Sequence, residues 1–164
     1  MDIHELFELG MKRELPRLLP AGPVALNLGA GKQNIHGAFP LDYPEWNAET
    51  DAIPCPDGSV DTIYAFHFLE HLSGVHVIRM LRECQRVLKV GGTLNVVVPH
   101  HLGSMAYHDL DHKTFWTEDQ FKTLFSTPYY DKNREEPWLF DIGLNVIIGI
   151  VQRNLAVMTQ LVRK

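Results

Sequence analysis

The stretch VALNLGAGKQNIHG, residues 24–37, sets the fold from which everything else in this sequence follows. It runs from apolar residues typical of a buried strand directly into Gly29 and Gly31. A glycine after a strand lets the backbone turn with positive φ, and its missing side chain lets a ligand approach the main chain. Open α/β sheets bind ligands at the carboxyl ends of their parallel strands. A plain strand-ending turn explains the two glycines equally well.

The neighbouring segments predict an α/β fold. Strands are expected over 24–28, up to position 42, over 60–66 and over 93–98, with helices over 3–19, 75–88 and 118–125. Gly91 and Gly92 are expected to end the second of these helices. Strand-like runs over 141–151 and 155–162 lie so close together that they permit only an antiparallel hairpin. We therefore expect a Rossmann-like, mostly parallel sheet with a C-terminal antiparallel hairpin and helices on both faces.

The ligand expected at this sheet is a nucleoside without a pyrophosphate. A dinucleotide fingerprint would need a third glycine where the chain has Asn34, and the link between the first two strands is too short for a crossover helix. That crossover must be reduced to a loop. Asp42 ends the second strand, where a carboxylate can accept hydrogen bonds from both ribose hydroxyls. An Asp before Tyr43 and Pro44 is also ordinary turn chemistry.

Length and composition limit the class of protein. The chain has 164 residues and a formal net charge of −5, which fits one globular domain and argues against a broadly basic nucleic-acid surface. Its apolar runs fall short of the roughly 20 residues of a membrane span, and its start lacks the pattern of a signal peptide. Cys55 and Cys84 have no metal-binding spacing. We expect a cytoplasmic protein with reduced thiols and no membrane partner.

Four motifs in order resemble one family. They are LNLGAG (26–31), LD (41–42), DAIPCPDGSVDTIYAFHFLEHL (51–72) and LRECQRVLKVGGTLNVVVP (81–99). Together they resemble the class I S-adenosylmethionine-dependent methyltransferases, closest to the small proteins of the type-11 domain group. The resemblance implies S-adenosylmethionine as cofactor and a single minimal methyltransferase domain over 1–164. Its expected parts are an N-terminal helix (1–22), a cofactor-binding core (23–99), a substrate or lid segment (100–137) and a C-terminal strand pair (138–164).

The resemblance also implies which residues contact the cofactor. They are Asn27, Gly29, Ala30, Gly31, Asp42, Asp51, Ala52, Phe66 and His67. The glycine loop would line the methionine part, Asp42 would hold the ribose hydroxyls, positions 51 and 52 would lie beside the adenine, and positions 66 and 67 would close the pocket. Asn27 stands where the family usually has an acid, so it supplies no carboxylate near the cofactor's amino group.

Histidines are concentrated between positions 67 and 112, and several lie in the segment PHHLGSMAYHDLDHKTFWTEDQF (99–121). Methyl transfer to oxygen or nitrogen needs a base, and a histidine of near-neutral pKa can act as one. His100, His101 and His108 are the candidate catalytic residues. We expect Trp116 to pack on the short helix, and Thr117 with Gln120 predicts a capping box.

Three functions remain open on these grounds. The first is a methyltransferase that acts on an oxygen or nitrogen of a small molecule, a glycan or another acceptor that is not nucleic acid. The second is a non-catalytic cofactor-binding or accessory subunit with the same fold. The third is a metal-dependent hydrolase built on the histidine cluster, in which HDLDH (108–112) offers metal ligands, although our expectation is no metal. A homo-oligomer is possible on the same grounds, because a neighbouring copy can cover a thin pocket wall.

Overall fold

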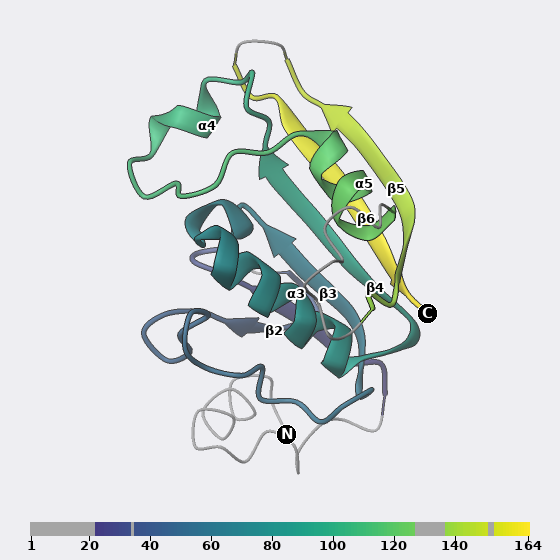
Figure 1. The fold of residues 1–164 in the computed structure, drawn as a ribbon. Helices are drawn as coiled ribbons and strands as arrows, with labels where there is room; N and C mark the ends of the chain where they lie inside the picture. The colour runs from purple at the N-terminus through teal and green to yellow at the C-terminus, as the bar shows by residue number, and fades with distance from the viewer. Residues whose placement is uncertain (1–21, 34, 127–136, 151–152) are drawn as a thin grey trace.

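The computed structural model describes residues 22–33, 35–126, 137–150 and 153–164. Figure 1 shows one sheet with helices beside it. The strands are β1 (Ala25–Leu28), β2 (Ala38–Leu41), β3 (Val60–Phe66), β4 (Leu88–Pro99), β5 (Phe140–Ile148) and β6 (Ala156–Arg163). The helices are the short 3-10 helix η2 (Leu69–His71), α3 (Gly74–Val87), α4 (Met105–His108) and α5 (Glu118–Ser126). The helix expected over 3–19 lies outside the described residues.

The strands form one mixed sheet in the order β2-β1-β3-β4-β6-β5. β1 pairs in parallel with β2 and with β3, and β3 pairs in parallel with β4. β6 runs antiparallel between β4 and β5. The prediction of a Rossmann-like, mostly parallel sheet with a C-terminal hairpin is confirmed. Because β1 to β4 run the same way, their carboxyl ends meet at one edge of the sheet.

The first crossover is a loop, as the short link requires. Residues 29–37 join β1 to β2, and the part of this link that the structure describes contains no helix. The parallel register pairs Ala25 with Ala38 and Leu28 with Leu41. The Gly29 N–H then donates to the Leu41 carbonyl at 2.8 Å, so the loop leaves β1 while still bonded to β2.

The prediction that Gly91 and Gly92 end α3 is wrong. The helix ends at Val87, and Leu88 already has extended backbone and begins β4. The pairing of β3 with β4 shifts between the Val60–Leu88 and Thr62–Thr93 pairs, so extra residues of β4 form a bulge there. Gly91 has φ +81°, and a side chain at Gly92 would lie 3.0 Å from the Asp61 carbonyl. The glycines therefore bend a strand.

The hairpin is present, with a longer connection than its sequence indicates. β5 ends at Ile148, because Gly149 turns with φ +99°. A side chain at Gly149 would lie 2.1 Å from the Asn154 carbonyl oxygen, so the two arms approach each other at a position that only glycine allows. β5 is an edge strand, and it exposes Leu144, Val146 and Ile148.

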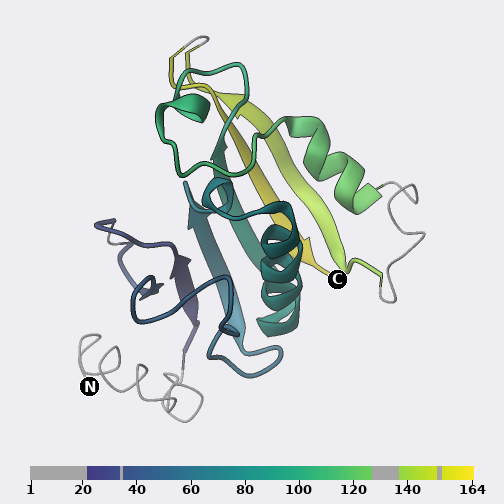
Figure 2. The ribbon, with the colours of Figure 1, turned by 60° about the vertical axis from the view of Figure 1, so that its left-hand side comes forward.

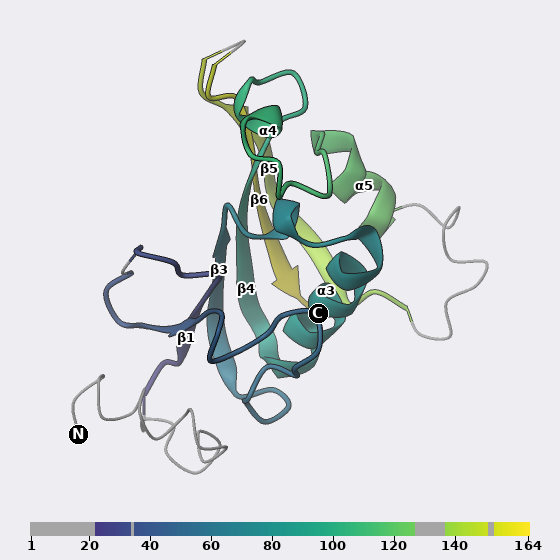
Figure 3. The same ribbon diagram turned by 90° about the vertical axis from the view of Figure 1, so that its left-hand side faces the viewer.

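The helices α3 and α5 lie against the same face of the sheet (Figures 2 and 3). α3 buries Val77, Leu81 and Cys84, which recur at helical spacing on one side. Cys55 and Cys84 are buried and form no disulfide. Among the helices in the described part of the chain, none has the length and apolar character needed to cross a bilayer.

Candidate functional site

A cavity of about 440 Å³ lies where β1, β2 and β3 end. Its walls come from the loop after β1, the loop after β2 and the turn after β3, and we call it the carboxyl-edge cavity. The residues that line it are Gly29, Gly31, Asp42, Tyr43, Trp46, Asn47, Ala48, Glu49, His67, Phe68, His71 and Leu72. The parallel topology thus gathers polar groups from three separate segments at one edge.

The two glycines of the first loop are required for different reasons. Both have positive φ, +62° at Gly29 and +51° at Gly31. A side chain at Gly29 would lie 2.3 Å from a ring carbon of Phe68, whereas one at Gly31 would meet only an Asp42 oxygen at 3.9 Å. The close neighbour of Gly29 is therefore the Phe68 ring, and Gly31 is the position that leaves open space beside the backbone.

Asp42 turns its carboxylate toward this loop. Its Oδ2 accepts a hydrogen bond from the Gly31 N–H at 2.5 Å, and its Oδ1 accepts one from the Tyr43 N–H at 2.9 Å. A carboxylate has about four lone-pair sites, so each oxygen keeps one for another donor. The residue lines the cavity, and two hydroxyl groups on adjacent carbons are donors that this arrangement can hold.

Asn27 acts on the shape of the loop. Its side chain is 3% exposed, and its Nδ2 donates to the Gln33 carbonyl at 3.0 Å. Ala30 is also buried, and its carbonyl accepts from the Gln33 N–H at 2.7 Å. Neither residue lines the carboxyl-edge cavity. An amide at position 27 ties the glycine loop to the end of β1 with a donor that a carboxylate lacks.

Asp51 and Ala52 lie behind the cavity wall. The Asp51 Oδ2 accepts from the Asn47 N–H at 2.8 Å, and the Ala52 carbonyl accepts from the Trp46 indole at 3.0 Å. Both residues hold the loop after β2, and the cavity is lined by its positions 46–49. From α3, Arg79 donates to the carbonyls of this loop at 2.9 and 3.0 Å. Sequence reasoning missed Trp46 and Asn47, for which the only signal was their place after Asp42.

The end of β3 sends two neighbouring side chains in different directions. Phe66 stacks edge-on with Tyr64 at 5.6 Å and does not line the cavity. His67 has φ +53° and does line it. Its Nδ1 lies 3.3 Å from Oε1 of Glu70, which is 1% exposed. The Glu70 carboxylate raises the pKa of His67, and burial opposes this shift.

The three candidate catalytic histidines do not line the cavity. His100 is 3% exposed, accepts from the Leu102 N–H at Nδ1, and meets Glu118 at 3.3 Å through Nε2. Both ring nitrogens are therefore engaged, which argues against a free base. The His101 ring packs at a tilt against His100, with the ring centroids 4.7 Å apart, and His108 is exposed on α4. For His101 and His108 a catalytic role stays a prediction.

The segment after α4 returns to η2. The N–H groups of Lys113 and Thr114 donate to the Glu70 carbonyl at 2.7 and 3.1 Å. The Lys113 ammonium reaches Glu49, on the cavity wall, at 2.8 Å. That hydrogen bond lowers the pKa of Glu49, although burial opposes it. The segment following β4 therefore closes against the same part of the molecule that lines the cavity.

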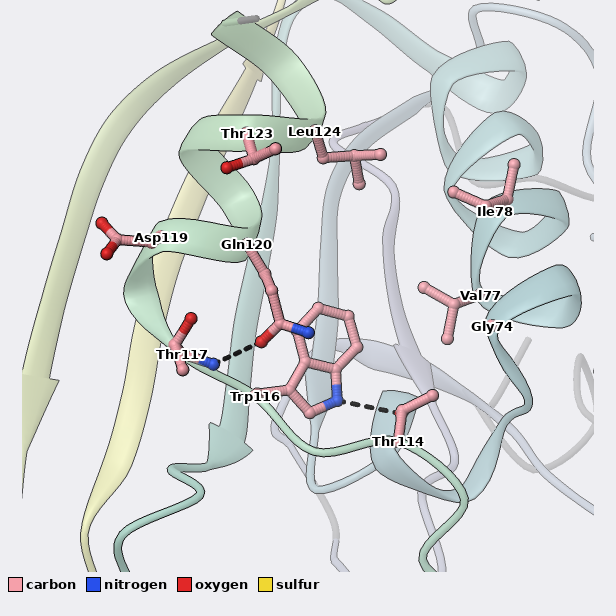
Figure 4. Close-up of a pocket in the computed structure, with 10 residues that line it drawn as sticks. All are labelled: Gly74, Val77, Ile78, Thr114, Trp116, Thr117, Asp119, Gln120, Thr123 and Leu124. Carbon is pink, nitrogen blue, oxygen red and sulfur yellow. Dashed lines mark hydrogen bonds between the residues drawn. The ribbon is translucent and has the colours of Figure 1, made fainter. Parts of the chain in front are cut away.

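A second cavity of about 350 Å³ lies between α3 and α5 (Figure 4). Trp116 forms part of its wall, donates to Thr114 at 3.0 Å and stacks on Phe121 at 5.0 Å, so packing accounts for its place. The Thr117 N–H donates to the Gln120 side chain at 2.5 Å, one half of the predicted capping box. This second cavity lies between two helices, whereas the carboxyl-edge cavity lies at the strand ends and is lined by Asp42 and Glu49, so we take the carboxyl-edge cavity as the candidate functional site.

Comparison with known proteins agrees with this geometry. Residues 24–96 match the profile of the family described as Methyltransferase domain. Among curated proteins, none matches the sequence closely enough to count as a relative.

Solved structures share the fold at low identity. An S-adenosylmethionine-dependent methyltransferase from Archaeoglobus fulgidus has a TM-score of 0.58 at 17% identity, covering 99% of this chain and 100% of its own. A Haloferax volcanii complex of the Trm112 methyltransferase activator with a putative methyltransferase has a TM-score of 0.56 at 16% identity, covering 98% and 93%. The [4+2]-cyclase SpnF has a TM-score of 0.58 at 14% identity, and the match covers 97% of this chain and 80% of the SpnF chain.

The residues of the cavity fit S-adenosylmethionine, the molecule named for the Archaeoglobus fulgidus methyltransferase. Asp42 has lone pairs for ribose hydroxyls, Gly31 leaves open space beside the backbone, and Trp46 with Phe68 supplies apolar wall. Residues 24–96, which carry the glycine loop, Asp42 and all of α3, therefore match the family described as Methyltransferase domain, and the solved structures of S-adenosylmethionine-dependent methyltransferases share the fold of the chain.

Proposed function

We propose that this protein transfers a methyl group from S-adenosylmethionine to an oxygen or nitrogen atom of a small molecule, a glycan or another acceptor that is not nucleic acid. The observation that carries the proposal is Asp42, whose carboxylate lines the carboxyl-edge cavity and is fixed there by the N–H groups of Gly31 and Tyr43. A fixed carboxylate binds hydroxyl groups without first losing conformational entropy.

The chain contributes chiefly by positioning. S-adenosylmethionine supplies an electrophilic methyl group on a sulfonium centre. Asp42 would hold the ribose, and Gly31 would let the rest of the ligand lie against the main chain. Phe68 and Trp46, 6.2 Å apart, offer apolar surface in the same cavity. Holding two reactants in line accounts for most of what a methyltransferase must do.

The acceptor side is proposed to lie in the segment over 100–137, of which 127–136 fall outside the described residues. Its described part contacts η2 and the cavity wall through Lys113. His101 and His108 are the remaining candidates for the base that removes a proton from the acceptor. The net charge of −5 continues to favour an acceptor other than nucleic acid.

A second function is a cofactor-binding or accessory subunit without turnover. Asn27 in place of an acid favours it, because a buried amide that holds the loop adds no charge for the cofactor's amino group. SpnF is described as a cyclase, and the Haloferax methyltransferase is bound to an activator, so this fold occurs with other chemistry and with partners. Detection of a methylated product from any acceptor excludes this alternative.

The test is calorimetric titration of the protein with S-adenosylhomocysteine. Loss of two charge-assisted hydrogen bonds in Asp42→Ala should weaken binding at least about 100-fold. Glu45→Ala removes an exposed acid of the same loop that does not line the cavity, and it should bind like wild type. Because Asp42 also anchors the loop, urea unfolding of both variants checks that they fold. Unchanged affinity in a folded Asp42→Ala would overturn the site assignment.

Two further expectations stay predictions. A cytoplasmic location rests on the sequence alone. In a homo-oligomer, a second copy of the chain would cover the apolar side chains that β5 exposes at the edge of the sheet. Sedimentation of the purified chain measures the oligomeric state.

A further inference from the structure

We propose that Glu70, His71 and His112 form a binding site for one divalent transition-metal ion of the zinc class. One ligand atom from each of the three residues lies within 4.8 Å of the others. From the sequence alone no metal is expected, and HDLDH (108–112) is the alternative metal site. The fold instead takes only His112 from that segment and joins it to two residues of η2. The site is independent of the proposed methyl transfer.

Glu70 is the first support for the proposal. It is 1% exposed, and neither carboxylate oxygen accepts a hydrogen bond from any described residue. On one side of the carboxylate His67 is an ion-pair partner, with its Nδ1 3.3 Å from Oε1. Oε2 has neither a hydrogen-bond partner nor an ion-pair partner among the described residues. A buried carboxylate oxygen without a partner is costly, and a metal ion is one of the partners that removes this cost.

His112 is the second support. Its Nδ1 lies 3.0 Å from the Ala106 carbonyl, which can only accept, so Nδ1 carries the proton and Nε2 keeps its lone pair. Histidines that bind metals usually donate their other N–H to a carbonyl or a carboxylate in this way, because the bond fixes tautomer and ring orientation. The imidazole is therefore held in the state that a metal ion requires.

The arrangement of the two rings is the third support. The centroids of His71 and His112 are 4.8 Å apart, with 78° between the ring planes. Two imidazoles on one tetrahedral zinc ion, each at roughly 2.0–2.1 Å, place their centroids about 5 Å apart. The ring spacing is therefore close to that of two imidazoles on one ion. Binding requires that the ligand atoms, which lie within 4.8 Å of one another, draw together by up to about 1.5 Å toward the spacing of a tetrahedral site.

The ligand set indicates which ion fits. Two imidazoles and one carboxylate suit Zn²⁺ and its neighbours, whereas Mg²⁺ and Ca²⁺ prefer oxygen ligands. Three protein ligands leave a fourth position for water or another oxygen ligand. His71 also lines the carboxyl-edge cavity, so the ion would lie beside that cavity. Lys113, which follows His112 in the sequence, is paired with Glu49.

The experiment titrates Zn²⁺, and Co²⁺ as a spectroscopic probe, into chelator-treated full-length protein without S-adenosylmethionine. We expect one ion per chain with a dissociation constant in the micromolar range or below, visible d–d absorption for Co²⁺, and a higher melting temperature. His112→Ala should weaken binding at least 100-fold and abolish the absorption. His36→Ala removes an exposed histidine of the first loop and should bind like wild type.

Glu70→Gln keeps the proposal falsifiable if His112→Ala does not fold. The amide preserves shape and removes the buried charge, so this variant should fold and lose Zn²⁺ binding. The proposal is overturned if wild-type protein binds no stoichiometric ion, or if folded His112→Ala or Glu70→Gln binds as tightly as wild type. Loss of S-adenosylhomocysteine binding would leave this result untouched, so the two proposals fail separately.

Discussion

The contact between Gly29 and Phe68 gives the sharpest quantitative prediction. Gly29→Ala and Gly31→Ala each force a side chain into the left-handed region, which costs about 1–2 kcal/mol. Only at Gly29 does the new Cβ also meet a ring carbon, at 2.3 Å, and Phe68 is buried beside Trp46 and has little room to move. Overpacking adds about 1–3 kcal/mol. We expect a loss of about 2–5 kcal/mol for Gly29→Ala and about 1–2 for Gly31→Ala.

The assay is equilibrium urea unfolding at neutral pH, with Phe68→Ala completing a double-mutant cycle. In the Phe68→Ala background the two ring contacts are gone and only the Cβ of residue 68 remains, at 3.0 Å, so the cost of Gly29→Ala should fall toward about 1–2 kcal/mol. The coupling between the two positions is then up to about 3 kcal/mol. Equal losses for the two glycine variants, or a Gly29→Ala cost that does not change when Phe68 is removed, would refute this explanation of Gly29.

Three further predictions concern stability and reactivity. The hydrogen bond from Lys89 lowers the pKa of Asp61 in the folded protein. The pair therefore stabilises the fold above about pH 4, and this stabilisation is lost as the pH falls through the folded-state pKa of Asp61. Asp61→Asn should therefore cost about 1 kcal/mol at pH 7, where the pair is partly exposed, and the difference from wild type should shrink in urea titrations near pH 3. Arg86 donates to two carbonyls of the loop at 53–55 and to a carboxylate of α3, so Arg86→Met should lower the free energy of unfolding by about 2–3 kcal/mol. Lys122→Met breaks an exposed ion pair and should change it by no more than about 0.5 kcal/mol. Equal losses for the two variants in thermal unfolding would contradict these roles. Burial raises the pKa of the Cys55 thiol to about 11 and also raises the pKa of Cys84. An aromatic disulfide reagent should therefore label neither thiol in native protein and both in urea. Rapid labelling without denaturant would show that the thiols are accessible.

Periodicity and spacing were enough to predict the sheet. Val77, Leu81 and Cys84 of α3 recur at helical spacing and are buried, and the short link from position 29 to 37 left a loop as its only form. The end of α3 was misjudged because Gly91 and Gly92 are typical of a helix terminus by sequence alone. Their real function, a bulge opposite Asp61, depends on pairing with a strand about 30 residues earlier in the chain, which local pattern does not contain.

A cavity residue could be predicted from the sequence where its place at a strand end alone brings it to the cavity. Asp42 ends a parallel strand, and any acid there lies at the ligand-binding edge. Asp51 acts indirectly, because its carboxylate accepts a hydrogen bond from the Asn47 N–H and so fixes the loop after β2. The cavity is lined by residues of that loop and not by Asp51 itself. Loop conformation depends on such side-chain contacts, and motif spacing carries no information about them.

The histidines show why residue type alone does not assign chemistry at this edge. His100 is held at both nitrogens, one by a backbone N–H and one by Glu118, and so packs as a structural residue. His67 lines the cavity and is paired with the Glu70 carboxylate. The Ala106 carbonyl holds the proton of His112 on Nδ1. Each role follows from the partners of the ring nitrogens, which the folded backbone and neighbouring side chains supply. A cluster of histidines in sequence therefore becomes, after folding, a structural residue, a cavity wall and a candidate metal ligand.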